Sequence, residues 1–393
     1  MIQLIYMSLM ILMTLALYYS GRKITTTDSE DSILKAGIVG IIAYTLNEGL
    51  RWGRGIDYNL YYYGYNDIGK GVETNWEPAY QLICKLFYSI GLPWQFMVAF
   101  MSFVLICSVC FFLRNFREVA HYALPLFGLL ALQAETLMRW YLAFSFIFIA
   151  LSLYLKEEKS KREYIYILLL CIISCSIHNA IFFIIPILWL ISKVKSPLVS
   201  PITAIVLYYG LGQLFSINFM NNFVHFFNMY SLGARYEDYS VNADYWLSRG
   251  YLVGEANAFM DLKYSAFWIM IVWFGHKICK ISDQKYTFVY NSFLIGFIFN
   301  PVYHQIELLN RYGSLLLLFQ FVVLAHILKK YFENSYNNLY FRLNYLARII
   351  IIVLSLNFSR SIFLYPFADK EDHYLYVWDA NGRETLDVTS YWE

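Results

Sequence analysis

Long apolar runs recur along the whole chain, and most of the segments between them are short and polar. A run of about 15 to 20 apolar residues is long enough for a helix that crosses the hydrocarbon core of a bilayer. Backbone polar groups in that core must be satisfied within the structure, so the repeated runs predict an all-α polytopic membrane protein. We expect about twelve transmembrane helices, within a range of about 11 to 14. The expected spans are residues 2–20, 33–50, 94–113, 119–134, 138–155, 164–177, 179–192, 198–216, 264–279, 286–301, 312–329 and 346–363.

One boundary between spans is ambiguous. Residues 164–192 could form one long tilted helix or two helices that meet at residues 176–179. We favour two helices, because two basic residues closely precede the stretch and two more follow it.

The composition supports a membrane protein and excludes other classes. Apolar residues make up 59% of the chain and charged residues 15%, well below the ~25% typical of soluble domains. The net charge of +2 comes without a basic face, so we expect no nucleic-acid partner. The six cysteines lie in or beside apolar segments, and neither a disulfide framework nor a zinc site is expected. The N-terminal run lacks a basic flank and a cleavage site, so we interpret it as a retained first span.

The distribution of lysine and arginine predicts the topology. Six loops hold more than half of the 30 basic residues: 21–32, 114–118, 156–163, 193–197, 277–285 and 329–345. By the positive-inside rule these loops are cytoplasmic, which places both termini and the polar segments 51–93, 217–263 and 302–311 outside. We expect a single membrane domain, residues 1–363, followed by an external tail, residues 364–393. An Asn-Gly pair at 381–382 gives this tail the pattern of a β-hairpin.

The longest early polar interruption runs from Arg51 to Gly91 and carries several candidate site residues. Arg51 and Arg54 could bind phosphate groups, or could anchor a helix end at the membrane surface. Asp57 follows a turn and could accept a proton from a sugar hydroxyl. Tyr58 and Tyr62 begin an aromatic stripe that could stack on sugar rings, or could belong to an aromatic belt at the headgroups.

The Glu77-Pro78 step predicts the start of a short helix over residues 78–90, because proline is well tolerated in the first helical turn. Glu77 would then cap this helix, or act as a general base. The helix is short for a span, so we expect it to be interfacial or re-entrant. Trp76 and Tyr80 flank the carboxylate as candidate glycan contacts.

Further candidates lie at the outer ends of other spans. Arg139 could bind a pyrophosphate or pair with Glu135, and His178 could contact a ligand or pack in the interior. The segment 216–262 offers Arg235, Tyr236 and Trp246, either for glycan binding or as an amphipathic lid. His304, Glu307 and Arg311 share one helical face, where a plain Glu307–Arg311 ion pair is the alternative. In the predicted topology all these ionisable groups lie near the same outer face, which is typical of a substrate path.

Four short motifs occur in order along the chain: Arg54-Gly55-x-Asp57-Tyr58, Glu77-Pro78-Ala79-Tyr80, Met138-Arg139-x-x-Leu142-Ala143 and His178-Asn179-Ala180. Together they resemble the EpsG-like family of bacterial polysaccharide polymerases, which are relatives of Wzy-type O-antigen polymerases. The resemblance extends from about Gly40 to about Arg311. The second motif lacks the glycine expected before its aromatic residue, and Gly53-Arg54-Gly55 leaves open whether Arg51 or Arg54 matches the family arginine.

The resemblance implies a glycosyltransferase-C-like helical fold in the bacterial inner membrane, with a site that faces the periplasm or exterior. Such enzymes join undecaprenyl-pyrophosphate-linked oligosaccharide units by inverting, metal-independent transfer, without a cofactor. We expect Arg139 and Arg311 on the pyrophosphate with Arg54 or Arg235 assisting, Asp57 or Glu77 as base, and His178 and His304 as orienting donors. A flippase and a chain-length regulator are further expected partners. The alternatives are a ligase for lipid-linked glycans, or a flippase or transporter.

Overall fold

The computed structural model describes residues 2–27, 32–55, 57–214, 258–279, 281–303, 307–333, 345, 347–356 and 376–379. Within these residues the chain is helical and forms no strand, which confirms the expected all-α class. A single isolated antiparallel bridge joins Arg51 to Tyr376 there. The chain divides into two compact units, one formed by Met1–Ile187 with Arg360–Glu393 and one by Leu188–Ser359.

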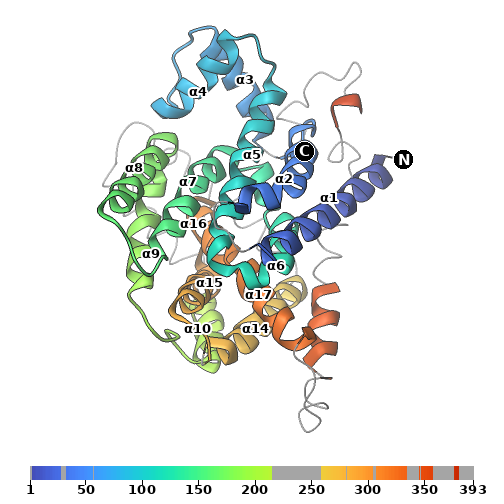
Figure 1. The fold of residues 1–393 in the computed structure, drawn as a ribbon, viewed down its shortest axis with the longest axis vertical. Helices are drawn as coiled ribbons and strands as arrows, with labels where there is room; N and C mark the ends of the chain where they lie inside the picture. The colour runs from blue at the N-terminus through green and yellow to red at the C-terminus, as the bar shows by residue number, and fades with distance from the viewer. Residues whose placement is uncertain are drawn as a thin grey trace. The chain divides into compact units, whose positions relative to one another are not determined.

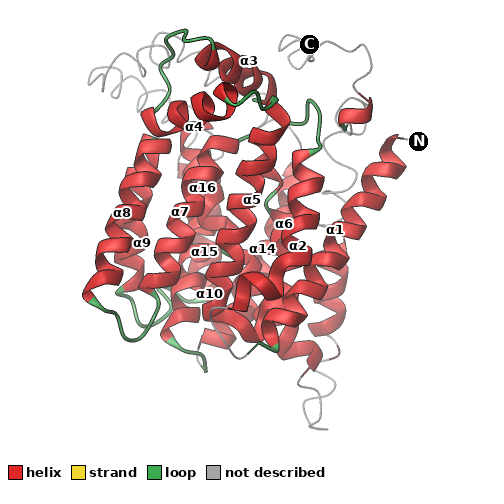
Figure 2. Ribbon diagram, turned by 45° about the horizontal axis from the view of Figure 1, so that its top comes forward, coloured by secondary structure: helices red, strands yellow, loops and turns green. Residues whose placement is uncertain are grey.

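The first unit is a bundle of helices with two shorter helices at one end (Figures 1 and 2). Its elements are α1 (Ile2–Thr25), α2 (Ile33–Gly49), α3 (Tyr58–Gly69), α4 (Pro78–Ser89), α5 (Trp94–Phe112), η2 (Leu113–Val119), α6 (Ala120–Leu130), η3 (Leu132–Glu135), α7 (Met138–Tyr154), α8 (Lys161–Ile177) and η4 (Asn179–Phe183). Helix α1 packs against α2 and α6, α2 against α5, α5 against α7, and α7 against α8.

Aromatic side chains fill the centre of this bundle. The ring of Phe148 lies 5.2 Å from that of Phe112 and 4.7 Å from that of Phe144, and all three are buried. Polar contacts between helices add direction to this packing: the backbone N–H of Gly40 donates to Ser20 Oγ at 2.7 Å. Hydrogen bonds of this kind help helices to associate in a bilayer, where lipid is as apolar as the side chains and the hydrophobic effect does not drive helices together.

Two breaks fall where the sequence predicts boundaries between spans. Between α5 and α6, Phe116 takes a non-helical conformation (φ −138°, ψ 37°). Between α8 and η4, His178 is extended (φ −150°, ψ 105°). The second break confirms that residues 164–192 form two helices.

Helices α3 and α4 pack against each other at one end of the first unit, and α4 also contacts α8 (Figure 2). Helix α4 begins at Pro78, as predicted, with proline in its first turn. Helix α3 was not predicted, because tyrosine, asparagine and glycine make up most of its sequence and are weak helix formers. Its buried tyrosines stabilise it through tertiary contacts instead.

The second unit contains α10 (Pro201–Leu214), α14 (Ala258–Cys279), α15 (Gln284–Tyr303), α16 (Glu307–Leu318), α17 (Gln320–Leu328), η5 (Lys329–Glu333) and a helix over Ala347–Leu356; α9 (Ile184–Ser192) leads into it along the chain. Helix α15 packs against α10, α16 and α17. Buried polar groups connect these helices: Trp268 Nε1 donates to Gln320 Oε1 at 3.1 Å, and the Tyr290 hydroxyl donates to the Val272 carbonyl at 3.0 Å.

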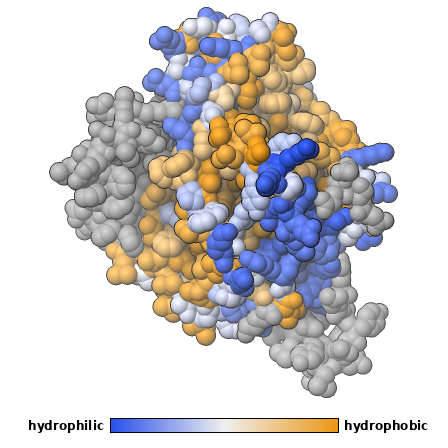
Figure 3. Space-filling model, turned by 60° about the vertical axis from the view of Figure 1, so that its left-hand side comes forward, coloured by the Kyte–Doolittle hydropathy of each residue, from blue (hydrophilic) through white to orange (hydrophobic). Residues whose placement is uncertain are grey.

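Three helical stretches within the described residues are long and apolar enough to cross a membrane: Leu4–Thr25, Trp94–Leu130 and Leu309–Phe332. Shorter apolar helices cover Met138–Tyr154, Asn179–Ser192, Pro201–Gly212, Ser265–Cys279 and Ala347–Leu356. Apolar residues also gather over much of the visible surface (Figure 3). These features establish a helical membrane protein, whereas the count of twelve spans and the glycosyltransferase-C-like fold stay predictions.

In the C-terminal tail, Val377–Asp379 form a short 3-10 helix, η7, and the β-bridge of Tyr376 is made with Arg51. Most of the expected hairpin, including its Asn-Gly turn, lies outside the described residues.

Candidate functional site

Four chain segments meet at one end of the first unit: the loop between α2 and α3, the start of α4, the connection between α6 and α7, and the break between α8 and η4. They bring two groups of buried polar residues to this end. We call the first group the Glu77 centre; it consists of Trp76, Glu77, Tyr80, Arg139, His178 and Asn179. We call the second the arginine cluster; it consists of Asn47, Glu48, Arg51, Arg54, Glu135 and Tyr376.

The carboxylate of Glu77 connects two other elements of the Glu77 centre. Its Oε2 lies 2.6 Å from Nη1 of Arg139, at the start of α7. Its Oε1 accepts a hydrogen bond of 3.3 Å from the backbone N–H of Asn179 and lies 4.0 Å from Nδ1 of His178. Glu77 itself is 6% exposed, so this ion pair is shielded from water and its Coulomb attraction is greater than at the surface.

Aromatic rings surround the charged groups of the centre. The Arg139 guanidinium carbon lies 5.3 Å from the ring centre of Trp76 and 5.7 Å from that of Tyr80, at cation–π distance. The His178 ring lies edge-on to Trp140 at 4.8 Å. Trp76 is half-buried, so it offers an accessible aromatic surface next to the guanidinium, as a sugar platform requires.

This geometry bears on two alternatives left open by the sequence, the capping role of Glu77 and the pairing of Arg139 with Glu135. Glu77 occupies the N-cap position of α4, but its side chain makes no capping hydrogen bond. The carboxylate instead binds Arg139 and Asn179. The ion-pair partner found for Arg139 is Glu77, whereas Glu135 is paired with Arg54.

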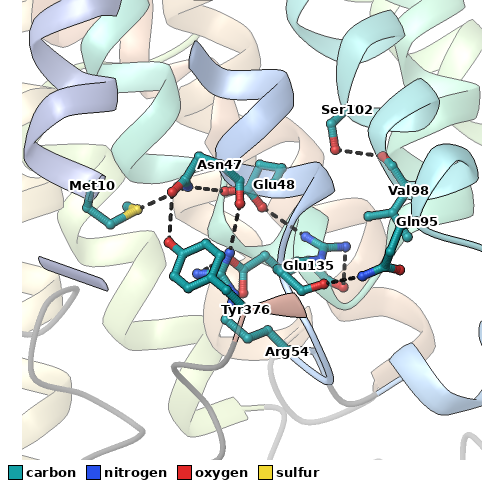
Figure 4. A network of polar contacts seen from close by, with 10 residues as sticks. Met10, Asn47, Glu48, Arg54, Gln95, Val98, Ser102, Glu135 and Tyr376 are labelled. Carbon is teal, nitrogen blue, oxygen red and sulfur yellow. Dashed lines mark hydrogen bonds and ion pairs between the residues drawn. The ribbon is translucent and has the colours of Figure 1, made fainter. Parts of the chain in front are cut away.

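The arginine cluster ties the α2–α3 loop to the connection before α7 (Figure 4). Nη1 of Arg51 pairs with Glu48 Oε2 at 2.9 Å, and Nη2 of Arg51 donates to the Glu135 carbonyl at 3.1 Å. Asn47 Nδ2 donates to the other oxygen of that carboxylate, Glu48 Oε1, at 2.9 Å.

Arg54 lies among aromatic rings. Its Nη1 is 3.6 Å from Glu135 Oε1, and its Nη2 donates to the Asn47 carbonyl at 3.3 Å. The guanidinium carbon lies 5.2 Å from the ring centre of Tyr6 and 4.9 Å from that of Tyr376. Burial disfavours the charged carboxylate and so raises the pKa of Glu135. Burial alone would lower the pKa of Arg54, but the nearby carboxylates of Glu135 and Glu48 outweigh it, and the pKa of Arg54 is raised.

Arg51 and Arg54 are each only 2% exposed, and both have carboxylate and backbone partners within the protein. A guanidinium held in this way is poorly placed to bind a phosphate group as well. The geometry therefore favours a supporting role over the phosphate-binding role predicted from the sequence.

Close approach of the α2–α3 loop to Glu135 depends on Gly55. This glycine has φ +100°, and a Cβ there would meet the Glu135 carbonyl oxygen. The Arg-Gly-x-Asp motif thus encodes a close backbone contact. Asp57 follows at the N-cap position of α3, partly exposed and without a side-chain capping bond.

The predicted glycan contacts differ in how accessible they are. Tyr58 is buried, and its hydroxyl donates to Gln95 Oε1 at 2.9 Å; Tyr80 is also buried. Tyr62 and Trp76 are half-buried and keep part of their rings accessible. Among these four aromatic residues, the last two are therefore better placed to meet a sugar.

The remaining candidates belong to the second unit or lie outside the described residues. Arg311 is half-buried in α16 of the second unit. Glu307 begins α16, and its side chain lies outside the described part of the structure, as do Arg235, Tyr236, Trp246 and His304.

Sequence reasoning missed several partners that hold the site together. Glu48 precedes Arg51 by three residues near a helix end, so their spacing could have identified this pair. Asn47 and Tyr376 carried no such local signal. Among the described residues, no group of three or more His, Cys, Asp or Glu side chains is arranged to hold a metal ion.

Residues 37–368 match the EpsG family, a range that includes the Glu77 centre and most of the arginine cluster. The chain belongs to the EpsG family. Membership indicates a membrane protein with a role like that of a polysaccharide polymerase. No match to this EpsG-family chain was found among the curated proteins or among the solved structures.

Proposed function

We propose that this EpsG-family chain joins undecaprenyl-pyrophosphate-linked oligosaccharide units into a surface polysaccharide. The observation that carries the proposal is the Glu77 centre, where one carboxylate lies against an arginine and near a histidine beside accessible aromatic surface. These are the groups that transfer from a pyrophosphate requires: a proton acceptor, a positive charge for the leaving group, and a platform for the sugar.

In the proposed step, an acceptor sugar hydroxyl attacks the anomeric carbon of the donor glycan. A new carbon–oxygen bond forms, the bond from that carbon to the pyrophosphate breaks, and the lipid pyrophosphate leaves with its bonding electron pair. The hydroxyl proton passes to the protein. One such displacement inverts the anomeric configuration, in agreement with the inverting transfer implied by the family resemblance.

Glu77 is the proposed base, with His178 orienting the hydroxyl. Nη1 of Arg139 lies 2.6 Å from the Glu77 carboxylate. A pyrophosphate would compete with Glu77 for the guanidinium, because both present oxygen anions that fit its planar donors. As Arg139 turns to the leaving group, the ion pair weakens and the carboxylate becomes a better proton acceptor. Binding of the donor would thereby activate the base.

Asp57 stays a rival base, because it is partly exposed in the loop that approaches Glu135. Arg311 and Arg235 stay proposed contacts for the pyrophosphate, and Tyr236, Trp246, His304 and Glu307 proposed contacts for the glycan. We place the reaction at the outer face of the bacterial inner membrane. A ligase for lipid-linked glycans would use the same groups, and assays with defined acceptors would distinguish it.

The test compares variants of the Glu77 centre in a strain that lacks the chromosomal gene. We expect Glu77→Gln and Arg139→Ala to lower polymer formation by about 100-fold or more, leaving single repeat units on the lipid carrier. Glu163→Gln and Arg117→Ala are matched controls. Glu163→Gln removes the ion pair with Lys156, and Arg117→Ala removes the hydrogen bond to the Thr27 carbonyl. Both contacts lie elsewhere in the first unit, so both variants should make normal polymer.

Surface glycan is separated by gel, and protein levels in the membrane are measured for each strain. Full-length polymer from Arg139→Ala at normal membrane levels would exclude the proposed role of this arginine. If deletion of the gene removes all surface glycan instead of leaving single units, the protein is a flippase and the polymerase proposal fails.

A further inference from the structure

Tyr376 lies beyond the residues that match the family, yet it is 1% exposed and packs within the arginine cluster. Its hydroxyl donates to Asn47 Oδ1 at 2.8 Å, across 329 residues of chain. Burial raises the pKa of this hydroxyl to about 12, so it stays protonated and can donate at neutral pH. The C-terminal segment therefore makes a specific buried contact with the end of α2.

Backbone contacts hold the same segment in register. Residues Arg51 and Tyr376 form an antiparallel bridge, and the Val377 N–H donates to the Leu50 carbonyl at 2.9 Å. The Trp378 ring stacks on the Tyr376 ring at 4.8 Å with an angle of 11° between the planes. We call residues 376–378 the docked segment.

The docked segment acts on the residues that fix the start of α7. The ring of Tyr376 lies 4.9 Å from the Arg54 guanidinium, and its backbone pairs with that of Arg51. Both arginines hold Glu135, at 3.6 Å through Arg54 and at 3.1 Å through Arg51. Three residues later α7 begins, and its second residue is Arg139 of the Glu77 centre.

We propose that Tyr376 is a positioning residue of the Glu77 centre, through which the C-terminal segment fixes the α2–α3 loop on Glu135 and thereby aligns Arg139 with Glu77. The expected effect of Tyr376 on turnover rests on the proposed function, whereas its contacts do not. Alignment errors of about 1 Å at a reacting group can reduce a rate about 100-fold. Tyr376 then affects turnover more strongly than substrate binding.

The experiment uses the full-length protein in membranes, with lipid-linked repeat units as substrate. We expect Tyr376→Ala to lower kcat by at least about tenfold and to change KM by less than about threefold. Tyr376→Phe keeps the ring beside Arg54 and loses the bond to Asn47, so it should retain an intermediate kcat. Tyr164→Ala removes an exposed tyrosine of α8 and should leave both constants unchanged.

A double variant tests the route of the effect. If the Tyr376 hydroxyl acts through Asn47, the Asn47→Ala variant should have a lowered kcat, and adding Tyr376→Phe should lower it by less than about twofold more. If the decreases in kcat caused by Asn47→Ala and by Tyr376→Phe multiply in the double variant, this route is contradicted. Unchanged kcat per folded protein in Tyr376→Ala would overturn the proposal, as would a loss confined to protein amount.

Failure of the proposed function has a different result. If the wild-type protein does not elongate lipid-linked units at all, the polymerase proposal fails. The contact of the docked segment can still be tested by thermal unfolding. Tyr376→Phe should then lower the Tm of the wild type but change that of Asn47→Ala much less. Equal decreases in both backgrounds would contradict the contact itself.

Discussion

Arg54 and Arg139 both pair with a glutamate, but their surroundings differ. Arg54 is enclosed by Tyr6, Tyr376 and Glu135. The side chain of Arg139 is 12% exposed and has Trp76 beside it. Removing one member of a fully buried ion pair costs about 3–5 kcal/mol, because the other charge is left uncompensated. Arg54 is therefore suited to holding the structure, and Arg139 to exchanging its partner for a substrate phosphate.

Gly64 determines how Trp76 is placed. It lies in α3, and a Cβ at this position would meet the Trp76 ring. We predict that Gly64→Ala lowers the free energy of unfolding by about 1–3 kcal/mol, because the ring must move out of a packed site. The same shift should reduce polymer formation. Thermal unfolding and gel analysis of surface glycan measure the two effects.

The matched control for Gly64 is Gly210, a glycine of α10 with open space where a Cβ would be added. Alanine is a better helix former than glycine, so Gly210→Ala should leave the stability unchanged or raise it by up to about 1 kcal/mol. Equal effects at the two positions would contradict the packing role of Gly64.

At the scale of elements, α4 has two different faces. Tyr80 and Cys84 are buried, while Leu82, Leu86 and Ile90 at its end are exposed. The last three recur every four residues, so they form one apolar row. A row of this kind lies stably in the membrane interface, where each such side chain gains about 1.5–3 kcal/mol when it leaves water.

We predict that a spin label at Leu86 or Ile90 collides with oxygen more often than with a water-soluble nickel complex, because both positions face lipid. A label at Glu157, in an exposed polar loop, should show the opposite preference. A nickel preference at all three positions would place α4 in water and exclude an interfacial helix.

The elements were predictable from the sequence to different degrees. The helices of the bundle follow the apolar runs closely, because the membrane imposes both their length and their composition. Pro78 identified the start of α4. Helix α3 was missed, because its stability comes from ring contacts such as Tyr61 with Trp76 at 5.7 Å and with Tyr80 at 6.3 Å, and not from helix propensity.

The candidate site was predictable residue by residue, but its pairing was not. Glu77, Arg139 and His178 are polar groups at helix ends, which a single sequence can identify. Their contacts span 62 and about 100 residues of chain, and Glu135 was an equally reasonable partner for Arg139 from spacing alone. Tyr376 had no signal, since its contact with Asn47 depends on how the whole unit folds.

At the scale of the whole first unit, α7 connects two chemically different ends. At the end opposite Arg139, Arg114 Nη2 donates to the Ser152 carbonyl at 3.0 Å, and Thr25 Oγ1 donates to the Arg117 carbonyl at 2.9 Å. The basic last turn of α1 and the basic segment 114–118 meet there. Helix α7 has 17 residues and is therefore about 26 Å long, close to the ~30 Å thickness of the hydrocarbon core. We therefore expect the Glu77 centre and this basic end of the first unit at opposite membrane surfaces.

The positive-inside rule then gives a prediction for topology. Cysteine at Val72 or Glu73, in the exposed loop before α4, should react with a membrane-impermeant maleimide on intact cells. Cysteine at Glu157 or Glu158, between α7 and α8, should react only after the membrane is permeabilised. The unsubstituted protein measures the background from its six cysteines, of which Cys84, Cys110 and Cys279 are buried.

The orientation matters for the chemistry as well as for the fold. If the Glu77 centre faces the exterior, its lipid-linked substrate must cross the membrane before the transfer, and a separate flippase has to supply it. The reverse labelling pattern would put the centre in the cytoplasm, where repeat units are not yet exported. That result would contradict the proposal that the polymer is assembled at the outer face, although the contacts of Glu77 with Arg139 and Asn179 would be unchanged.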